Sequence, residues 1–433
     1  GKGQGLQLVE GPGSGSYFHT VLNDSGDVIF GDRQRLWRAG TPPELIAVAS
    51  QGGIAPGSYI PSQFDTAFYI EGAVLSDNAQ IAFAANTGPA RGIWYGVAND
   101  LQLIAKADSV VPGDPLGRIL LRTGTPQIND AGEVLFAAGI STAPTYETPF
   151  SRAVYLWDRT RRLDRLAADG DVIHTERGDL HLSEVFASEL NNAGHVTLNA
   201  TATDGTRYLL RRTAAGTEVI AADNDIFGDE LIHLTSEQTL GGNGDVAYIA
   251  FMRGGNAVPN EALQILKNST GQPPIAVART NTQPPGAPTG TVFALFGINS
   301  GLVINSHGQV AFGAVLRDAA TAEKSFGIWA QDRFGELKKI VMVGDVIDVD
   351  TGPGEDLRIV NSALGPGLAS NERGAASQFN NRGQLLFSAT FTDGSSGVFI
   401  SNEVAIPEPD GALIAASWVM VQVATKRRRT RRI

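Results

Sequence analysis

Cysteine is absent from this chain of 433 residues. Its absence excludes disulfide bonds, thiol catalysis and cysteine-ligated zinc. The sequence also has no Gly-x-Ser-x-Gly nucleophile elbow and no phosphate-binding loop. Six histidines are present, but they lie far apart and no pair has the spacing of a zinc protease. The usual catalytic motifs are therefore missing.

Charged residues are also sparse, at 18% of the chain, and the formal net charge is −11. The last 27 residues hold six Lys and Arg and two acidic residues, so the rest of the chain carries 28 basic and 43 acidic residues. An acidic body repels phosphate groups. We therefore expect no nucleic-acid partner.

One short pattern runs through most of the chain: an Asn or another turn-forming residue, two further residues, usually a Gly, and then a strand that ends in an aromatic residue or Leu. Its copies begin at Asn23, Ser76, Asn129, Asn191, Gly241, Asn305 and Asn380. With 42% apolar residues, 51 Gly and 21 Pro, the chain has enough material for a large core with many turns. The repeat predicts units that stack on one another to bury that core.

The Asn-x-x-Gly segments are interpreted as turns. An Asn side chain accepts a backbone N–H in an Asx turn, and Gly adopts the positive φ that returns the chain to the sheet. The alternative is a row of Asn side chains that binds a ligand. The residues concerned are Asn23, Gly26, Asn129, Gly132, Asn191, Gly194, Asn305, Gly308, Asn380 and Gly383.

Two further strands follow each turn, but the last unit stops after Val398–Ile400. Its missing strand has a match at the other end of the chain, because Leu6–Val9 resembles Leu101–Ile104. We therefore predict that residues 1–405 form an all-β, seven-bladed β-propeller, closed by pairing of the N- and C-terminal strands. The rival architecture is an open β-solenoid or two stacked β-domains.

The clearest copy, Asn305–Phe312, reads NSHGQVAF. This segment resembles the repeat of a family of bacterial exported proteins with tandem NxxGxxAF motifs, and the likeness extends over residues 20–400. The resemblance implies export and a repeated structure. It implies no activity.

The tail, residues 406–433, combines Pro407-Glu408-Pro409, an apolar run from Gly411 to Ala424 and a basic cluster. The cluster consists of Lys426, Arg427, Arg428, Arg429, Arg431 and Arg432. This order resembles the Pro-Glu-Pro C-terminal (PEP-CTERM) sorting signal, which is read by exosortase-type membrane proteases. We expect a short hydrophobic helix whose basic end stays in the cytoplasm. The run of 14 residues is shorter than the ~20 of a full span, and an amphipathic surface helix is the alternative.

The resemblance of the tail implies a sequence of events. The protein would be exported, inserted transiently in the membrane as a transmembrane helix, cut near Pro407–Pro409, and left at the cell surface or outside the cell. Export requires a signal peptide, whereas Gly1–Gln4 has neither Met nor an apolar stretch. We therefore expect this chain to be a mature or truncated form.

Acidic loops are the candidates for a metal site. Asp345, Asp348 and Asp350 lie close together in the sequence, and a second cluster spans Asp223–Glu230. Oxygen-rich loops can hold calcium, although neither loop has the ligand spacing of a known calcium loop. Solvated acidic loops are the alternative. No other cofactor is expected.

Three hypotheses about function remain. The favoured one is a non-catalytic cell-surface propeller that binds extracellular polysaccharide or a surface protein, or has a structural role in the matrix. The second is a hydrolase or lyase that acts on polysaccharide, with carboxylates at the mouth of the propeller. The third is a calcium-stabilised adhesin. The insertion at residues 345–374 is the first place where we expect a recognition loop.

Overall fold

The computed structural model describes residues 19–22, 28–31, 35–38, 44–48, 70–86, 91–97, 100–111, 114, 116–142, 150–158, 160, 162–254, 262–297, 301–349, 356–364, 379–405 and 419–421. These residues form 33 strands, and no helix occurs among them. The expected all-β class is confirmed.

The described strands form seven sheets in which neighbouring strands are antiparallel. The first two sheets follow the chain order: β1 (His19–Leu22), β2 (Val28–Gly31), β3 (Arg35–Arg38) and β4 (Glu44–Val48), then β5 (Ile70–Leu75), β6 (Ile81–Asn86), β7 (Arg91–Val97) and β8 (Asp100–Lys106). In the third sheet, two short strands share one neighbour. It contains β9 (Ile119–Thr123) and β10 (Gln127–Ile128), which both pair with β11 (Val134–Ser141), followed by β12 (Ser151–Trp157) and β13 (Leu163–Ala168).

The next two sheets have five strands each in chain order. They are β14 (Val172–Thr175), β15 (Gly178–Leu190), β16 (Val196–Ala202), β17 (Arg207–Thr213) and β18 (Gly216–Ala222), then β19 (Ile226–Phe227), β20 (Glu230–Leu240), β21 (Val246–Arg253), β22 (Ala262–Asn268) and β23 (Ile275–Arg279). A single parallel pair, Thr175 with Thr217, also joins β14 to β18 and closes that sheet on itself.

The last two sheets complete the described body. In the sixth sheet, β24 (Thr291–Phe296) and β25 (Leu302–Ile304) both pair with β26 (Val310–Asp318), which is followed by β27 (Lys324–Gln331) and β28 (Leu337–Met342). The seventh sheet contains β29 (Val346–Asp348), β30 (Leu357–Leu364), β31 (Leu385–Phe391), β32 (Ser396–Ser401) and β33 (Val419–Val421).

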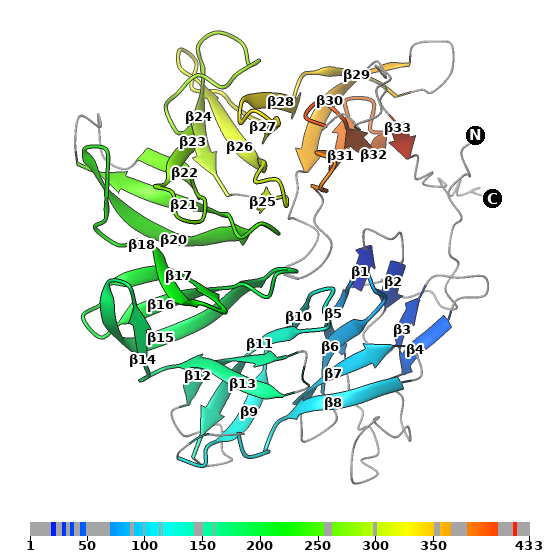
Figure 1. Ribbon diagram of the computed structural model, residues 1–433. Coiled ribbons are helices and arrows are strands. Elements are labelled where there is room, and N and C mark those ends of the chain that lie inside the picture. Colours follow the sequence, from blue (N-terminus) through cyan, green and yellow to red (C-terminus); the bar gives the residue numbers. More distant parts are fainter. Residues whose placement is uncertain are drawn as a thin grey trace, which may run out of the picture.

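The sheets follow one another around a ring (Figure 1). The strand that precedes the Asn-x-x-Gly turn lies on the inside of the ring, because these strands touch one another in succession: β1 contacts β5, β10 contacts β5 and β15, and β20 contacts β15 and β25. Radial antiparallel sheets that converge on such inner strands define a β-propeller. The expected propeller architecture is therefore confirmed.

The core lies between neighbouring sheets and is built on a recurring aromatic pair. Phe83 stacks on Trp94 at 5.8 Å between ring centroids, and Phe387 stacks on Phe399 at 5.4 Å. A glycine two residues before the second aromatic makes room for its ring, since a Cβ on Gly327 would lie 2.7 Å from Trp329. In the third sheet Phe136 stacks on Tyr155 at 5.6 Å between ring centroids.

The expected C-terminal helix over Gly411–Ala424 is not supported. Within this run, Val419–Val421 forms β33 and pairs with β32, and the rest of the run lies outside the described residues. A Val-rich segment satisfies the edge of a sheet by pairing with its unpaired N–H and C=O groups. Within the described part of the chain, no helix has the length and apolar character needed to cross a membrane.

The sequence predicts that Leu6–Val9 pairs with the last strand of the ring, but in the structure another segment pairs with β32. The structure places Val398 opposite Val421 and Ile400 opposite Val419, so the tail occupies the free side of β32. Leu6–Val9 itself lies outside the described residues.

Candidate functional site

The Asn-x-x-Gly segments join the innermost strand of each sheet to the next strand along the chain, such as β5 to β6 and β15 to β16, at one end of the ring. We call the described ones the turn ring: residues 76–79, 129–132, 191–194, 241–244, 305–308 and 380–383. Asn23 and Gly26 of the first copy lie outside the described residues. Because the turn ring brings together residues 50 to 75 positions apart, it is the first place to look for a site.

Each Asn at the start of a turn holds its own turn together. The Asn191 Oδ1 accepts the Ala193 N–H at 3.0 Å and the His195 N–H at 2.9 Å, and its carbonyl accepts the Gly194 N–H at 3.0 Å. Asn129, Asn305 and Asn380 accept the equivalent pairs of N–H groups. The side-chain oxygen therefore replaces a backbone acceptor, as in an Asx turn.

The amide nitrogen of the same Asn reaches the next turn. The Nδ2 of Asn129 donates to the carbonyl of Asn191 at 3.0 Å, and the Nδ2 of Asn191 donates to the carbonyl of Gly241 at 2.9 Å. Asn305 repeats this contact with the Asn380 carbonyl at 3.1 Å. The row of Asn side chains thus links consecutive sheets, and its polar groups are engaged within the protein.

Two observations explain why Gly occupies the fourth position of these turns. The φ angle is +77° at Gly194 and +75° at Gly308, in the left-handed region. A Cβ on Gly194 would also lie 2.9 Å from Glu133 Oε2, and one on Gly308 would lie 2.5 Å from Asp245 Oδ2. These two turns therefore pack closely against the acidic residue that follows the preceding turn.

Cations on β17 and β22, each the third strand counted from the inside of the ring, bind the next turn. The Arg211 guanidinium on β17 donates to the Gly244 carbonyl and pairs with Glu218, and Lys267 Nζ on β22 donates to the Gly308 carbonyl at 2.8 Å. Burial lowers the pKa of Lys267, and the nearby Asp245 carboxylate opposes this shift. The role of these cations was not predicted from the sequence, where the signal is an Arg or Lys at the same place in two repeats.

The contact between turns can be isolated by substitution. Asn191→Asp keeps the acceptor oxygen but replaces the amide donor, so the Gly241 carbonyl loses its partner and faces a carboxylate. We expect the free energy of unfolding to fall by about 1–3 kcal/mol in denaturant titrations. Asn268→Asp is the matched control, because Asn268 Nδ2 donates to the Gln272 carbonyl at a more exposed hairpin. An equal loss in both variants would contradict the proposed link between sheets.

A second recurring turn follows the outermost strand and leads to the next sheet. We call these the linking turns. Asp171, Asp225 and Asp345 each follow a residue with positive φ, and one carboxylate oxygen accepts an N–H three residues back, from Ala168, Ala222 and Met342 respectively. The other oxygen pairs with a cation: Arg165, Arg177 and Lys339. Three antiparallel strands separate each of these turns from the turn-ring segment before it, so the linking turns lie at the opposite end of the sheets from the turn ring.

Asp345, one of the candidate metal ligands, has a structural role in a linking turn. Asp345 is the third member of a repeated turn, and Lys339 Nζ lies 2.7 Å from its Oδ1. Asp348 Oδ1 accepts the Asp356 N–H at 3.1 Å, while Asp350 lies outside the described residues. Among the described residues, no group of three His, Cys, Asp or Glu side chains could hold a metal ion.

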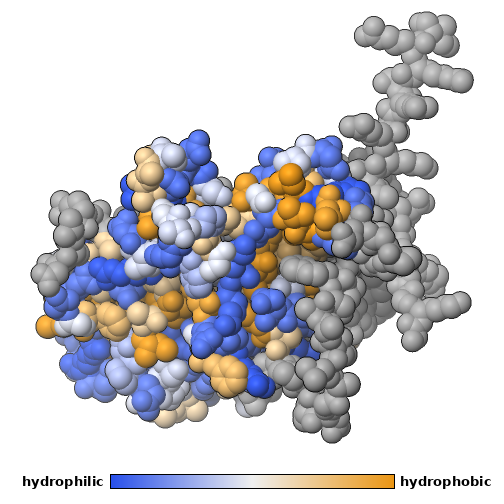
Figure 2. Space-filling view, turned by 90° about the horizontal axis from the view of Figure 1, so that it is seen from above, coloured by the Kyte–Doolittle hydropathy of each residue, from blue (hydrophilic) through white to orange (hydrophobic). Residues whose placement is uncertain are grey.

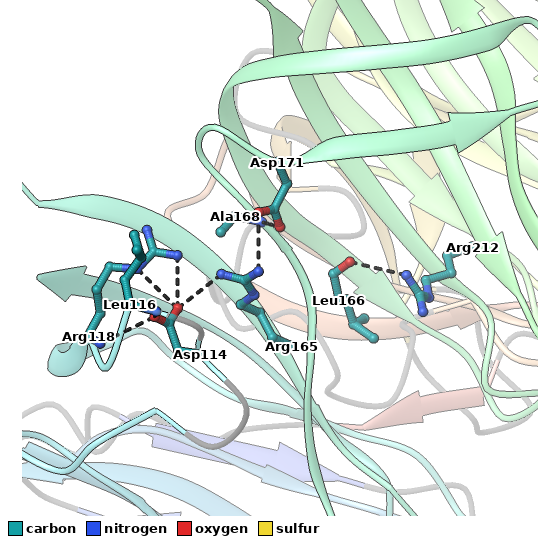
Figure 3. Close-up of polar contacts among 8 residues, drawn as sticks. All are labelled: Asp114, Leu116, Arg118, Arg165, Leu166, Ala168, Asp171 and Arg212. Atoms are coloured by element: carbon teal, nitrogen blue, oxygen red, sulfur yellow. Dashed lines mark hydrogen bonds and ion pairs between the residues drawn. The ribbon is translucent and has the colours of Figure 1, made fainter.

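A buried ion pair joins the loop after β8 to the third sheet (Figure 3). The side chain of Asp114 is fully buried, and its Oδ2 lies 2.8 Å from Arg118 Nη2 and 3.1 Å from Arg165 Nη1. Arg165 also binds Asp171 of a linking turn. Burial by itself would raise the pKa of Asp114, but the hydrogen bonds from Arg118 and the Leu116 N–H hold it below its usual value.

The carboxylates at the turn ring are part of the same network of hydrogen bonds. Asp130 Oδ1 accepts the Asp77 N–H at 2.8 Å, and its Oδ2 accepts from Asn192. Glu133 Oε2 accepts from Asn129 at 2.6 Å. These acids come from neighbouring repeats and bind neighbouring turns, so the geometry describes a scaffold of linked turns.

The fold and its linked turns define a β-propeller, and comparison with known proteins gives its family. The chain belongs to a family of unknown function (DUF7453), whose model matches residues 85–210 and 206–413. A search of curated proteins returned no match.

Several solved structures resemble the chain at low identity. The β-propeller domain of the trilobed protease from Pyrococcus furiosus is 10% identical over 81% of this chain and 85% of that one, with a TM-score of 0.40. Prolyl oligopeptidase B from Galerina marginata is 10% identical over 94% and 50%, with a TM-score of 0.43. A lectin from Aleuria aurantia is 11% identical over 75% and 94%, with a TM-score of 0.30. A likeness at this level carries no argument about activity or ligand.

Proposed function

We propose that this protein is a non-catalytic, seven-bladed β-propeller that is exported, cut at its C-terminal tail by an exosortase-type protease, and retained at the cell surface or in the extracellular matrix. There it binds a polysaccharide or a surface protein, or has a structural role. The observation that carries the proposal is the turn ring. Its repeated Asn, Gly and acidic residues bind neighbouring turns, which makes the repeat a scaffold.

Seven blades are supported by the seven sheets of the described residues and by seven copies of the turn in the sequence. One sheet per copy is the relation expected when each repeat unit supplies one blade. The sorting tail is supported by its order of Pro-Glu-Pro, apolar run and basic cluster.

Two kinds of exposed residue support a binding role. At the turn ring, four sheets present an exposed Asn: Asn78, Asn192, Asn243 and Asn381. Each of these amides makes a hydrogen bond within the protein and has further donor or acceptor capacity. Amides donate and accept hydrogen bonds, as the hydroxyl groups of a polysaccharide require.

At the linking turns, the residue after each Asp is apolar and exposed: Val172, Ile226 and Val346, at 42%, 74% and 58%. Figure 2 shows one face of the molecule, where apolar side chains gather in patches on a largely polar surface. Exposed apolar patches rimmed by polar residues are typical of surfaces that bind a protein.

The sorting signal is tested in a bacterium that carries an exosortase-type protease. We expect the protein recovered from the cell surface to end near Pro407–Pro409, as determined by mass spectrometry of its C-terminal peptide. Glu408→Gln should abolish this cut, because the acid between two prolines is the distinctive part of the signal. Glu403→Gln is the matched control and should be cut normally. A wild-type protein that keeps its tail, or a Glu408 variant cut as efficiently as the control, would refute processing.

A further inference from the structure

An aromatic side chain on an inner strand is exposed where the third and fourth sheets meet. Phe186 lies on β15, and 43% of its surface is accessible to solvent. Arg152 lies on β12 of the third sheet, and its guanidinium carbon is 4.4 Å from the centre of the Phe186 ring. The Nη1 of Arg152 is also 2.9 Å from Oε1 of Glu184, on the same strand as Phe186. We call Arg152, Glu184 and Phe186 the inter-sheet triad.

The next boundary, between the fourth and fifth sheets, has an Arg at the same place with a different role. Arg152 and Arg207 are equivalent, because their carbonyls accept the N–H groups of Asp169 and Asp223, just before the linking turns. The Nε of Arg207 donates to Asp223 at 3.0 Å. The oxygens of Asp169 instead accept the backbone N–H groups of Arg152 and Val185, at 2.7 and 2.9 Å. The Arg152 guanidinium is therefore released from that role and joins the other two members of the triad.

The triad offers an apolar ring beside polar groups of both signs. A sugar has C–H groups that pack on the surface of an aromatic ring, and hydroxyls that accept from a guanidinium and donate to a carboxylate. The side chains of Arg152 and Glu184 are 38% and 48% exposed, so both present polar atoms to solvent. Because Glu184 balances the charge of Arg152, the triad favours a neutral sugar and would repel the carboxylate of an acidic one.

A hollow of about 280 Å³ lies between the same two sheets. Its lining includes small side chains of the third sheet, Gly124, Thr125 and Ala137, and also Ala187, which follows Phe186 in β15. This volume is close to the lower limit of the ~300–1,000 Å³ of small-molecule pockets. A chain of sugars that contacts Phe186 therefore has space for a neighbouring unit beside the same strand.

We propose that the inter-sheet triad is a binding site for a neutral polysaccharide. One sugar packs on the exposed surface of the Phe186 ring, while the guanidinium of Arg152 donates to its hydroxyls and the carboxylate of Glu184 accepts from them. Arg152 also holds the ring in place from its other side, as a cation over an aromatic face does. The inference rests on the binding role proposed above and deepens it, because it names the class of ligand and the residues that recognise it.

The test is an array of neutral polysaccharides (glucans, mannans, galactans and xylans) and acidic ones (polygalacturonate and alginate), probed with the full chain. The wild type should bind at least one neutral polysaccharide, and titration should show binding at least about tenfold weaker for Phe186→Ala, as expected when a stacked ring is lost. Arg152→Met, which keeps the length of the side chain but removes its donors, should weaken binding as well. Phe186→Trp keeps an aromatic ring and should retain binding.

Phe334→Ala is the matched control, because Arg333 lies 4.6 Å from the centre of that ring in the turn between β27 and β28, outside the triad. It should bind as the wild type does. Melting temperatures followed by circular dichroism should be similar for all variants, because the members of the triad are partly exposed.

Two results would overturn the inference in different ways. If the wild type binds a neutral polysaccharide and both Phe186→Ala and Arg152→Met bind it equally well, the triad is not the site, but the proposed binding role stands. If the wild type binds no neutral polysaccharide, or binds acidic ones alone, the inference fails together with neutral polysaccharide as the ligand in the proposed function. Processing of the tail is tested separately and is unaffected by either result.

Discussion

Replacement of Trp329 by Ala is expected to lower the free energy of unfolding by about 3–5 kcal/mol, as large aromatic truncations in a core do. The Trp329 side chain is completely buried, its ring packs edge-on against Phe293 at 5.0 Å, and its Nε1 donates to the Pro285 carbonyl at 3.0 Å. The cavity would open between two strands of one sheet and the loop that precedes β24. Denaturant titration followed by circular dichroism measures the loss.

Two further variants separate the causes of this loss. Trp329→Phe keeps an aromatic ring but removes the N–H donor, so we expect a smaller loss of about 1–3 kcal/mol. Phe334→Ala removes an aromatic residue that is 75% exposed and should change stability by less than about 0.5 kcal/mol. If Trp329→Ala were as stable as Phe334→Ala, the described packing around Trp329 would be wrong.

Replacement of Asp114 by Asn is expected to cost about 3 kcal/mol of stability at pH 7. The change removes a fully buried carboxylate that pairs with Arg118 and Arg165. It takes the counter-charge from Arg118 and leaves Arg165 with Asp171. Asp164→Asn is the matched control, because Asp164 pairs with Arg162, whose side chain is 70% exposed. Exposed pairs contribute less than about 1 kcal/mol.

The Asp114 pair also predicts a dependence on pH. Because its pKa is lower in the folded than in the unfolded chain, the stability it provides is complete above the unfolded value of about 3.9 and is lost as the pH falls through the folded value. The stability difference between wild type and Asp114→Asn should therefore be constant at neutral pH and shrink below about pH 4. A difference that grows on acidification would contradict the assigned pairing.

The number of sheets and the order of their strands follow from local chemistry. Asn at one end of a turn and Gly at the other act within five residues, and alternation with a period of two identifies each strand. Seven copies in the sequence therefore correspond to seven sheets in the described part of the chain. Val134 and Phe136 are buried as the alternation predicts, but Leu135 between them is buried too, because the sheet packs on both of its faces.

The partners of the linking turns are set by packing. Asp345 looks like a calcium ligand when three acids are counted along the sequence. In the structure, its oxygens bind Lys339 and the Met342 N–H. The sequence contains a sign of this repeated turn, because Asp171 and Asp225 also follow the outermost strands of their sheets.

The tail shows how far an apolar run can be interpreted without its neighbours. Fourteen mostly apolar residues before a basic cluster favour a helix in a membrane, where backbone groups must be satisfied within the segment. Beside β32 the same residues find backbone partners in another strand, and Val419–Val421 pairs there. The environment, rather than the composition, decides between the two conformations.

The sequence by itself determined the repeat, the turn chemistry and the all-β class, because these depend on residues within a few positions of one another. Only the tertiary structure decided which groups the turns bind. The amide of Asn191 meets the Gly241 carbonyl, and the guanidinium of Arg211 meets Gly244, across separations that no local pattern encodes. These contacts exist because the sheets converge toward the middle of the ring, where residues from successive repeats come within hydrogen-bonding distance.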